Sequence, residues 1–224
     1  MNYSTEQFNI LTDSELENNY VKNIYNQIAP KFDLTRTYYW ACVKEFLSLI
    51  DKTSEKKILD VGCGNGRYVK LFGQMETHCL DNSEELLKIV SSRYPNVHTI
   101  CSDVTELPYS DGTFDHVISI AVIHHLSSES RRIKMLEEII RVLKVGGTGI
   151  ITAWATSTPT DKFTPINENS DYLIPWAHQF VRFYHLFSEG EFQNLIANSQ
   201  YKNQVVINKI IFECDNWAIQ IIKV

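Results

Sequence analysis

Short apolar segments alternate with amphipathic segments between residues 56 and 154. The apolar segments have the length and composition of buried strands, and they predict strands at 57–61, 77–81, 97–102, 116–122 and 149–154. The intervening segments predict helices at about 66–73, 84–93 and 130–144. Parallel strands that follow one another need crossovers, which are almost always right-handed. The alternation therefore predicts an α/β fold, a mostly parallel sheet with helices on both faces.

Two segments outside this core predict additions to it. Residues 1–55 form an N-terminal extension with apolar residues about one helical turn apart, and Pro30 is expected to end its first helix. Residues 155–181 hold three prolines and many small polar residues, which predicts a long surface loop. We take the substrate-side loop as 155–187, because long loops inside compact domains are often functional.

The C-terminal part predicts one helix and a hairpin. The helix begins near Ser188, with Glu191 placed as a capping-box partner. Strands are expected at 205–212 and 217–224, and the connection between them is so short that they must be antiparallel. The chain is then a single domain over residues 1–224.

Composition excludes several classes of protein. With 224 residues, 44% of them hydrophobic, the chain can bury a sizeable core and is not disordered. No apolar stretch approaches the roughly 18 residues that a membrane helix needs, so we expect no membrane contact. The polar, acidic N-terminus favours a cytoplasmic protein, with the nucleus as a second location. The five cysteines include no C-x-x-C pair, so we expect neither a disulfide framework nor a metal site.

The charge balance bears on nucleic-acid binding. Net charge is −6, from 21 Lys and Arg against 27 Asp and Glu, which argues against binding DNA or RNA through bulk positive charge. One local basic patch occurs in the expected helix at 130–144, where it can equally be a solvated face that also carries glutamates. Its basic residues are Arg131, Arg132, Lys134, Arg141 and Lys144.

A glycine-rich turn directly follows the first expected strand. Its sequence places Asp60 before Gly62, Gly64 and Gly66, in the spacing G-x-G-x-G. Glycines let the backbone approach a ligand closely. A dinucleotide site would have its third glycine one position later, and its pyrophosphate would be repelled by the carboxylate of Asp60. The turn therefore favours a ligand that carries positive charge, such as an ammonium and a sulfonium.

Two further acids follow the next two strands. Asp81 ends the second strand and can accept both hydroxyls of a ribose, while Asp103 ends the third and can accept an adenine amino group. Either acid alone is more often a helix cap or a turn residue. Three acids at successive strand ends indicate a ligand site, because open α/β sheets bind ligands along that edge.

These motifs resemble the class I S-adenosylmethionine-dependent methyltransferases. The resemblance implies a seven-stranded, Rossmann-like sheet with the last strand antiparallel, and S-adenosylmethionine as cofactor. It also implies that Asp60 and the glycine turn face the methionine part and that Asp81 faces the ribose. The cofactor residues that it implies are Asp60, Gly62, Gly64, Asp81, Asn82, Asp103, Val104 and Ala121.

A narrower resemblance rests on segments outside those motifs, and it is to the eukaryotic tRNA wobble-uridine methyltransferases. It implies transfer of a methyl group to the carboxylate of 5-carboxymethyluridine at position 34 of the tRNA anticodon. The segments that carry it lie within residues 20–40, 118–125, 131–132, 153–155, 175–176, 182–191 and 215–217.

The candidate substrate residues follow from the chemistry of an anionic substrate. A carboxylate needs no strong base, so alignment should supply most of the rate. Arg36 and Arg182 are the candidates for gripping it, although each is as often a structural salt-bridge residue. We expect His124 to position the substrate; a general-base role for His124 or His125 is the alternative. Further substrate contacts are expected from His125, Trp154, Tyr184 and His185.

The resemblance also implies a protein partner, a small zinc-binding methyltransferase activator that forms a heterodimer. The apolar strand at 97–102 is the expected sheet edge, and an uncovered edge is an aggregation liability. Two other functions fit the cofactor motifs: a small-molecule carboxyl or hydroxyl methyltransferase, and a binding protein of this fold without turnover.

Overall fold

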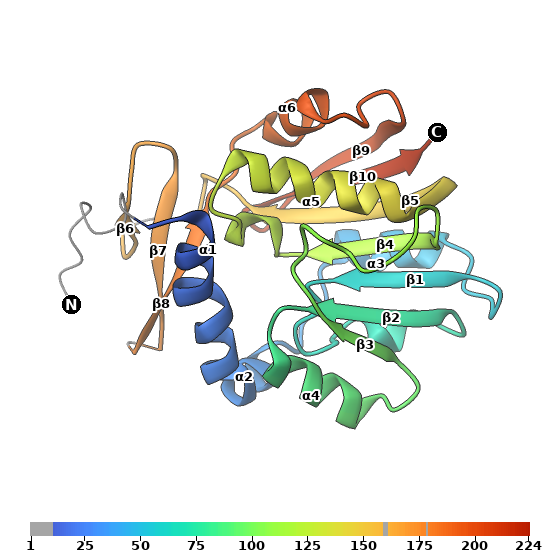
Figure 1. Cartoon of the computed structure of the whole chain (residues 1–224), viewed down its shortest axis with the longest axis horizontal. Coiled ribbons are helices and arrows are strands. Elements are labelled where there is room, and N and C mark those ends of the chain that lie inside the picture. The colour runs from blue at the N-terminus through green and yellow to red at the C-terminus, as the bar shows by residue number, and fades with distance from the viewer. Residues whose placement is uncertain (1–10, 159–160, 178) are drawn as a thin grey trace.

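A seven-stranded sheet forms the centre of the molecule (Figure 1). The structure is a computed structural model that describes residues 11–158, 161–177 and 179–224. The strand order across the sheet is β3-β2-β1-β4-β5-β10-β9. These strands are β1 (Lys57–Val61), β2 (Glu76–Asp81), β3 (His98–Cys101), β4 (Phe114–Ile120), β5 (Leu143–Trp154), β9 (Val205–Glu213) and β10 (Asn216–Lys223).

The strand directions confirm the predicted fold class. Strands β1 to β5 pair in parallel, whereas β10 is antiparallel to both of its neighbours, β5 and β9. The terminal hairpin is therefore present as expected, and β3 is an edge of the sheet. The carboxyl ends of the parallel strands meet along one side, which is where ligands bind in open α/β sheets.

Helices cover both faces of this sheet. On β1, the neighbouring residues Ile58 and Leu59 are both fully buried and point to opposite faces. Ile58 packs in the cluster that holds α3 (Ala41–Leu49), and Leu59 packs in the cluster that holds α5 (Glu129–Val142) and α6 (Glu191–Asn198). Helix α4 (Glu84–Arg93) packs on β2 and β3. No helix in the described part of the chain is long and apolar enough to cross a membrane.

The expected helix at 66–73 is wrong. The segment contains one 3₁₀ turn, Val69–Leu71, between Gly66 and Gly73. Both glycines take positive φ, 69° and 68°, which an α-helix does not accommodate. Only a single turn can form between two such positions.

Pro30 does not end the first helix, contrary to expectation. The N-terminal cover of the molecule is α1 (Asp13–Glu17), a π turn (Asn18–Lys22) and α2 (Asn23–Thr35), and Pro30 lies inside α2. A proline there costs about 3 kcal/mol. Burial of Ile28 and Ala29 and the ion pair of Asp33 with Arg93 offset this cost.

The expected loop at 155–187 is also wrong, because it contains a second sheet. Strands β6 (Thr164–Pro165), β7 (Asp171–Trp176) and β8 (Phe180–His185) form an antiparallel sheet in that order. Its residues Leu173 and Phe183 pack against Leu16 and Val21 of the N-terminal cover. Figure 1 shows α1 and α2 between this small sheet and the carboxyl ends of the central strands. Composition pointed to a loop, but tertiary packing stabilises three strands there.

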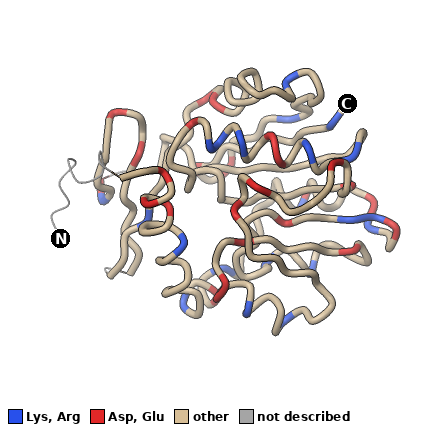
Figure 2. The backbone as a smooth tube through the Cα atoms, viewed as in Figure 1, with Lys and Arg blue, Asp and Glu red and all other residues tan. Residues whose placement is uncertain are grey.

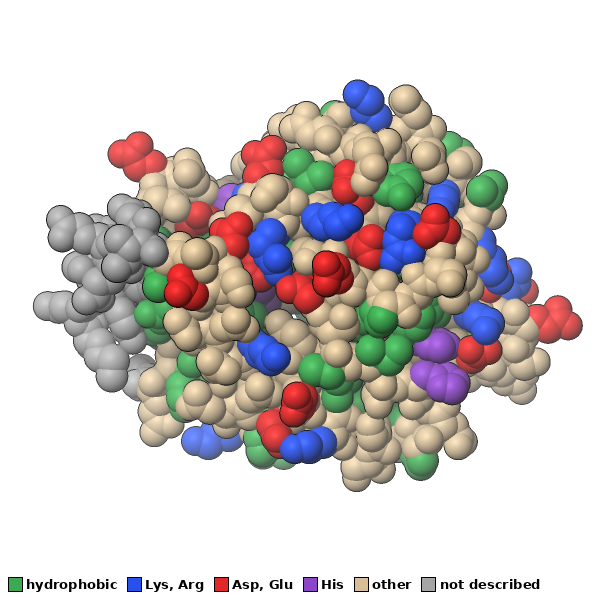
Figure 3. All heavy atoms as spheres, viewed as in Figure 1, with side chains coloured by type: hydrophobic (Ala, Val, Ile, Leu, Met, Phe, Trp, Pro, Cys, Tyr) green, Lys and Arg blue, Asp and Glu red, His purple; other side chains and the backbone are tan. Residues whose placement is uncertain are grey.

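The basic patch on α5 is a paired surface. Arg131 bonds Glu17 and Asp103, and Arg141 bonds Glu138 and Asp111. The remaining members also lie against acids: Arg132 near Glu191, Lys134 near Glu138 and Lys144 against Asp115. Figure 2 shows acidic and basic residues interleaved along this helix, and Figure 3 shows acidic and basic side chains mixed on the same face of the molecule. The helix therefore presents no continuous positive field.

Candidate active site

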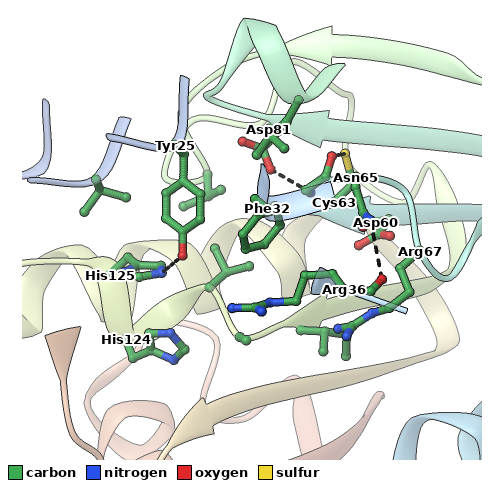
Figure 4. Close-up of a pocket in the computed structure, with 18 of the residues that line it drawn as sticks. Tyr25, Phe32, Arg36, Asp60, Cys63, Asn65, Arg67, Asp81, His124 and His125 are labelled. Carbon is green, nitrogen blue, oxygen red and sulfur yellow. Dashed lines mark hydrogen bonds between the residues drawn. The ribbon is translucent and has the colours of Figure 1, made fainter. Parts of the chain in front are cut away.

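A cavity of about 390 Å³ lies at the carboxyl ends of β1, β2 and β4, beneath the N-terminal cover (Figure 4). One part of its wall comes from the glycine-rich turn and the strand ends, and the opposite part comes from α2, the 3₁₀ turn Ile123–His125 and β8. The predicted site residues that line it are Arg36, Asp60, Gly62, Gly64, Asp81, Asn82, Val104, Ala121, His124, His125, Trp154 and Tyr184. Most of the predicted site residues therefore lie on this wall.

The carboxylate of Asp60 lies in this wall, and one of its oxygens lacks a hydrogen-bond partner in the described part of the chain. Its Oδ2 atom is buried and accepts no hydrogen bond from any described residue. Burial, followed by the nearby charge of Asp81, raises the pKa of Asp60 to about 8, and Arg67 acts in the opposite direction. A buried acid without a partner is costly unless a ligand supplies donors or positive charge. The site therefore suits an ammonium group.

The glycine turn packs closely against neighbouring side chains. Gly62 has φ of +71°, and a Cβ added there would lie 2.4 Å from a methyl carbon of Val122. Gly64 has φ of +55° and faces the ring of Phe32. The amides of Gly62 and Cys63 both donate to the carbonyl of Leu80, which fixes the turn on β2. Side chains are excluded here for steric reasons.

Asp81 ties the turn to the second strand end. Its Oδ2 accepts the amide hydrogen of Gly64 at 2.8 Å and its Oδ1 accepts that of Ser83 at 2.9 Å. Burial raises the pKa of Asp81 despite these backbone donors. Asp81 and Asn82 both line the cavity, so the carboxylate is held where it can accept further hydrogen bonds from a ligand.

Asp103 does not line the cavity, which corrects the expected adenine contact. Its carboxylate accepts hydrogen bonds from the amide and hydroxyl of Thr105 and from Arg131 at 2.7 Å. Burial raises the pKa of Asp103, but these donors lower it more. Its neighbour Val104 does reach the cavity, so apolar contact remains at this strand end.

Arg131 also connects the cover to the sheet, a role that sequence reasoning missed. Its guanidinium donates twice to Glu17, at 2.8 Å for each bond, as well as to Asp103. Glu17 in turn accepts the amide of Ser127. On the far side of the cavity, Asn26 accepts hydrogen bonds from the Ser83 hydroxyl and the Glu85 amide. The cover is thus attached on both sides.

The two histidines are buried, neutral and fixed in opposite tautomers. Nδ1 of His124 accepts the backbone N–H of Trp154 at 3.2 Å, so Nε2 carries the hydrogen. His125 donates from Nδ1 to the carbonyl of Phe183, so its Nε2 accepts the hydroxyl of Tyr25 at 2.9 Å. Burial lowers the pKa of both, and that of His125 falls to about 3. Neither is poised to act as a base at neutral pH.

Three arginines around the cavity lack acidic partners in the described ranges: Arg36, Arg67 and Arg182. Arg36 and Arg67 line the cavity. Arg182 lies behind the wall, 3% exposed, and donates to the Tyr25 hydroxyl at 3.0 Å. The chain's other four arginines all lie within 4.0 Å of a carboxylate. Arg67 and Tyr25 were not predicted, although Arg67 directly follows the glycine turn.

Aromatic rings fill the space between these cations and the histidines. The Tyr184 ring stacks on His124 with centroids 4.6 Å apart and lies 4.9 Å from the Trp154 ring. Arg36 lies 4.7 Å above the Phe32 ring and 5.4 Å from the Trp176 ring. This part of the cavity is therefore aromatic and positively charged.

His185 was expected to contact substrate, and the structure places it elsewhere. Its Nδ1 lies 2.6 Å from Asp171 and its Nε2 lies 2.7 Å from Glu191. Burial lowers the pKa of His185, but the two carboxylates raise it above its ordinary value. With both ring nitrogens engaged, His185 connects β8 to α6 and does not line the cavity. Glu191 also accepts the amide of Ser188, as the expected capping residue.

Comparison with known proteins agrees with this geometry. Residues 59–151 match the family profile described as a methyltransferase domain. A protein from Pyrococcus horikoshii has a similar fold, with a TM-score of 0.67 and 22% identity over 81% of this chain and 88% of its own. With the unpaired Asp60 and the glycine turn at the strand ends, these findings define an S-adenosylmethionine-dependent methyltransferase of class I.

Two curated relatives narrow the family. The tRNA (carboxymethyluridine(34)-5-O)-methyltransferase of Schizosaccharomyces pombe is 33% identical over 209 residues, which is 83% of this chain and 90% of the relative. The Arabidopsis thaliana enzyme of the same name is 40% identical over 178 residues, 77% of this chain but only 42% of the relative. The chain belongs to this methyltransferase family, and it spans less than half of the second relative.

One further structural neighbour is a complex. It consists of the Haloferax volcanii Trm112 methyltransferase activator and a methyltransferase. The TM-score is 0.65 at 16% identity, over 89% of this chain and 97% of the matched one. At this identity the likeness establishes the shared fold.

Proposed function

We propose that this chain transfers a methyl group from S-adenosylmethionine to the carboxylate of 5-carboxymethyluridine at the wobble position of tRNA, giving the methyl ester. The observation that carries the proposal is the set of three arginines without acidic partners in the described structure, Arg36, Arg67 and Arg182. Cations left unpaired around a cavity favour an anionic ligand. The names of the two curated relatives point to the same substrate.

The residues present fit the cofactor. Asp60 would hold the ammonium group, Gly62 and Gly64 would let the methionine part approach the backbone, and Asp81 would accept the ribose hydroxyls. When bound, S-adenosylmethionine supplies a methyl group on a positively charged sulfur. The substrate carboxylate is already ionised at neutral pH, so this chain has to supply alignment rather than a base.

The protein's own groups divide this task between them. Arg36 and Arg182 hold the carboxylate or a neighbouring phosphate, because a guanidinium can donate two parallel hydrogen bonds. His124 is neutral and carries its hydrogen on Nε2, so it positions the substrate as a donor. Tyr184 and Trp154 offer aromatic faces on which an extruded base can stack.

We also propose a zinc-binding activator as partner, docked on the edge strand β3. His98 and Cys101 of this strand are exposed, and its outer backbone groups have no neighbouring strand among the described residues. Pairing with a partner strand would satisfy these groups. The neighbour that is solved with an activator supports the proposal.

We propose a cytoplasmic location, with the nucleus second.

The decisive assay uses anticodon stem-loops that carry either 5-carboxymethyluridine or uridine at position 34. The purified chain, with and without the activator, should form a methyl ester on the first stem-loop and none on the second. Methylation of free 5-carboxymethyluridine as efficiently as of the stem-loop would favour a small-molecule enzyme. Cofactor binding without turnover on any of these, with the activator present, would contradict the proposal.

The partner is tested separately by solubility. Expressed alone, the chain should aggregate, and co-expression with the activator should keep it in solution, because β3 is then covered. Full solubility and full activity of the isolated chain would contradict a required partner.

A further inference from the structure

Two buried donors beside the cavity have no acceptor in the described part of the molecule. They are the indole Nε1–H of Trp176, at the end of β7, and the Nε–H of Arg182 on β8. The two residues are close, since the Arg182 guanidinium carbon lies 5.1 Å from the Trp176 ring. Buried polar groups are nearly always hydrogen-bonded, so two orphaned donors side by side indicate a missing acceptor.

The residues around these donors add further donors and no negative charge. The Trp176 ring also contacts Arg36, whose guanidinium carbon lies 5.4 Å from the ring centroid. Arg36 lines the cavity as well. No carboxylate of the described residues lies within 4.0 Å of either guanidinium. A buried cation is stable only with an anion or a ligand nearby. The cluster of Trp176, Arg182 and Arg36 therefore carries positive charge that a bound anion would neutralise.

The hydroxyl of Tyr25, which contacts Arg182 beside Tyr184, is already committed. Tyr25 accepts from Arg182 at 3.0 Å and donates to Nε2 of His125 at 2.9 Å. That direction is fixed, because His125 uses its only hydrogen, on Nδ1, for the carbonyl of Phe183. Tyr25 thus positions Arg182 from the N-terminal cover. It leaves the Nε–H of Arg182 free for a ligand.

We propose that Trp176, together with Arg182 and Arg36, forms a donor-only site that binds the substrate's carboxylate and rejects the corresponding carboxamide. The proposal rests on the proposed function and adds Trp176 as a specificity-determining residue. A carboxylate presents acceptors on both oxygens, whereas a carboxamide presents an NH₂ group on one side, which would face N–H donors. Such a mismatch leaves buried donors unpaired, which is how polar sites achieve strong discrimination.

The test compares stem-loops that carry 5-carboxymethyluridine with stem-loops that carry 5-carbamoylmethyluridine. The carboxamide cannot form the ester, so its binding is measured as inhibition. Wild-type protein should bind the acid at least about 10-fold more tightly than the amide, as expected from one charged hydrogen bond. Equal binding of acid and amide by wild-type protein would overturn the proposal without any variant.

Trp176→Phe keeps the ring and removes the donor. It should lower kcat/KM on the acid by about 10- to 100-fold, reduce the preference for acid over amide by a similar factor, and leave cofactor affinity unchanged. Trp176→His restores a ring N–H and should recover part of the loss. Trp217→Phe on β10, a tryptophan whose ring packs against Phe212 and not against Arg36 or Arg182, is the control and should behave as wild type. A Phe variant with unchanged preference and kcat/KM would overturn the proposal.

The experiment separates this inference from the function on which it rests. If wild-type protein with its activator does not methylate the acid stem-loop, the proposed function fails. The donor-only site is then tested by calorimetry with the two free nucleosides. A preference of the wild type for the acid that Trp176→Phe abolishes supports the site, and no preference overturns it.

Discussion

The two halves of the cavity have opposite electrostatic character. The cofactor half brings together two buried acids, Asp60 and Asp81, whose pKa values burial raises. The substrate half brings together the guanidinium groups of Arg36 and Arg182 with neutral histidines and aromatic rings. Among the described residues, these acids and these guanidinium groups take part in no ion pair within 4.0 Å. Each half therefore depends on its own ligand for neutralisation.

The two halves also differ in how they are built. The cofactor half uses the ends of neighbouring parallel strands, which are held by backbone ladders and by the 2.8 Å bond from the Gly64 amide to Asp81. The substrate half is assembled from α2, a 3₁₀ turn and the small second sheet, all packed through side chains. We expect substitutions in the cofactor half to change cofactor affinity and substitutions in the substrate half to change turnover.

The largest effect is expected from Arg182→Ala. Loss of one charged partner for the substrate should lower activity on the modified stem-loop by about 10- to 1000-fold, with cofactor affinity unchanged. Arg141→Ala, which breaks ion pairs outside the cavity, is the control. At saturating cofactor the rate should stay flat from pH 6 to 8, because burial keeps His124 neutral. A profile governed by one histidine, with Arg182→Ala near full activity, would favour a general base.

Asp81→Ala should act on the other half. Loss of the acceptor for the ribose hydroxyls should weaken S-adenosylmethionine binding by about 1–3 kcal/mol, as measured by calorimetry. Part of the loss reflects the freed amides of Gly64 and Ser83, so Asp81→Asn, which keeps one oxygen, should lose less. Unchanged affinity of the Asp81→Ala variant for S-adenosylmethionine would contradict the assignment of Asp81 to the cofactor site.

The same contrast explains what the sequence could predict. Asp60 and Asp81 were found because parallel strands end at one edge, so residues distant in sequence share a known position. Asp103 was placed correctly at its strand end, but its ion pair with Arg131 depends on a helix that the pattern does not position.

In the substrate half, similar local reasoning failed. His185 and Arg182 are three residues apart on β8, yet His185 pairs with Asp171 and Glu191, whereas Arg182 packs against Tyr25 and Trp176. Proline content concealed the strand β7, and with it the N–H donor of Trp176. Side-chain packing between distant segments decides these roles, and a single sequence carries little signal for it.

A smaller effect is expected from the proton on Asp60. Because its pKa is about 8 without ligand and a bound ammonium would lower it, binding should release a proton below pH 8. Affinity for S-adenosylmethionine should therefore rise by about fivefold from pH 7 to pH 8 and level off above the pKa. Calorimetry in buffers of different ionisation enthalpy measures the released proton. Asp60→Asn should remove both the proton release and the pH dependence, and proton uptake on binding would contradict the assignment.

The smallest effect is expected where the two halves are joined, at the bonds of Arg131 to Glu17 and Asp103. Partly exposed ion pairs contribute about 0.2–1 kcal/mol each, so Arg131→Ala should weaken cofactor binding by only about two- to fivefold. The loss should appear as faster cofactor dissociation and faster hydrogen exchange in α1 and α2, because the cover is released on one side. Arg141→Ala, on the same helix but paired with Glu138 and Asp111, should change neither. If Arg131→Ala and Arg141→Ala behave alike, the bonds of Arg131 do not help the N-terminal cover to retain the cofactor. The two halves of the cavity then influence each other only through the cofactor and the substrate that they bind.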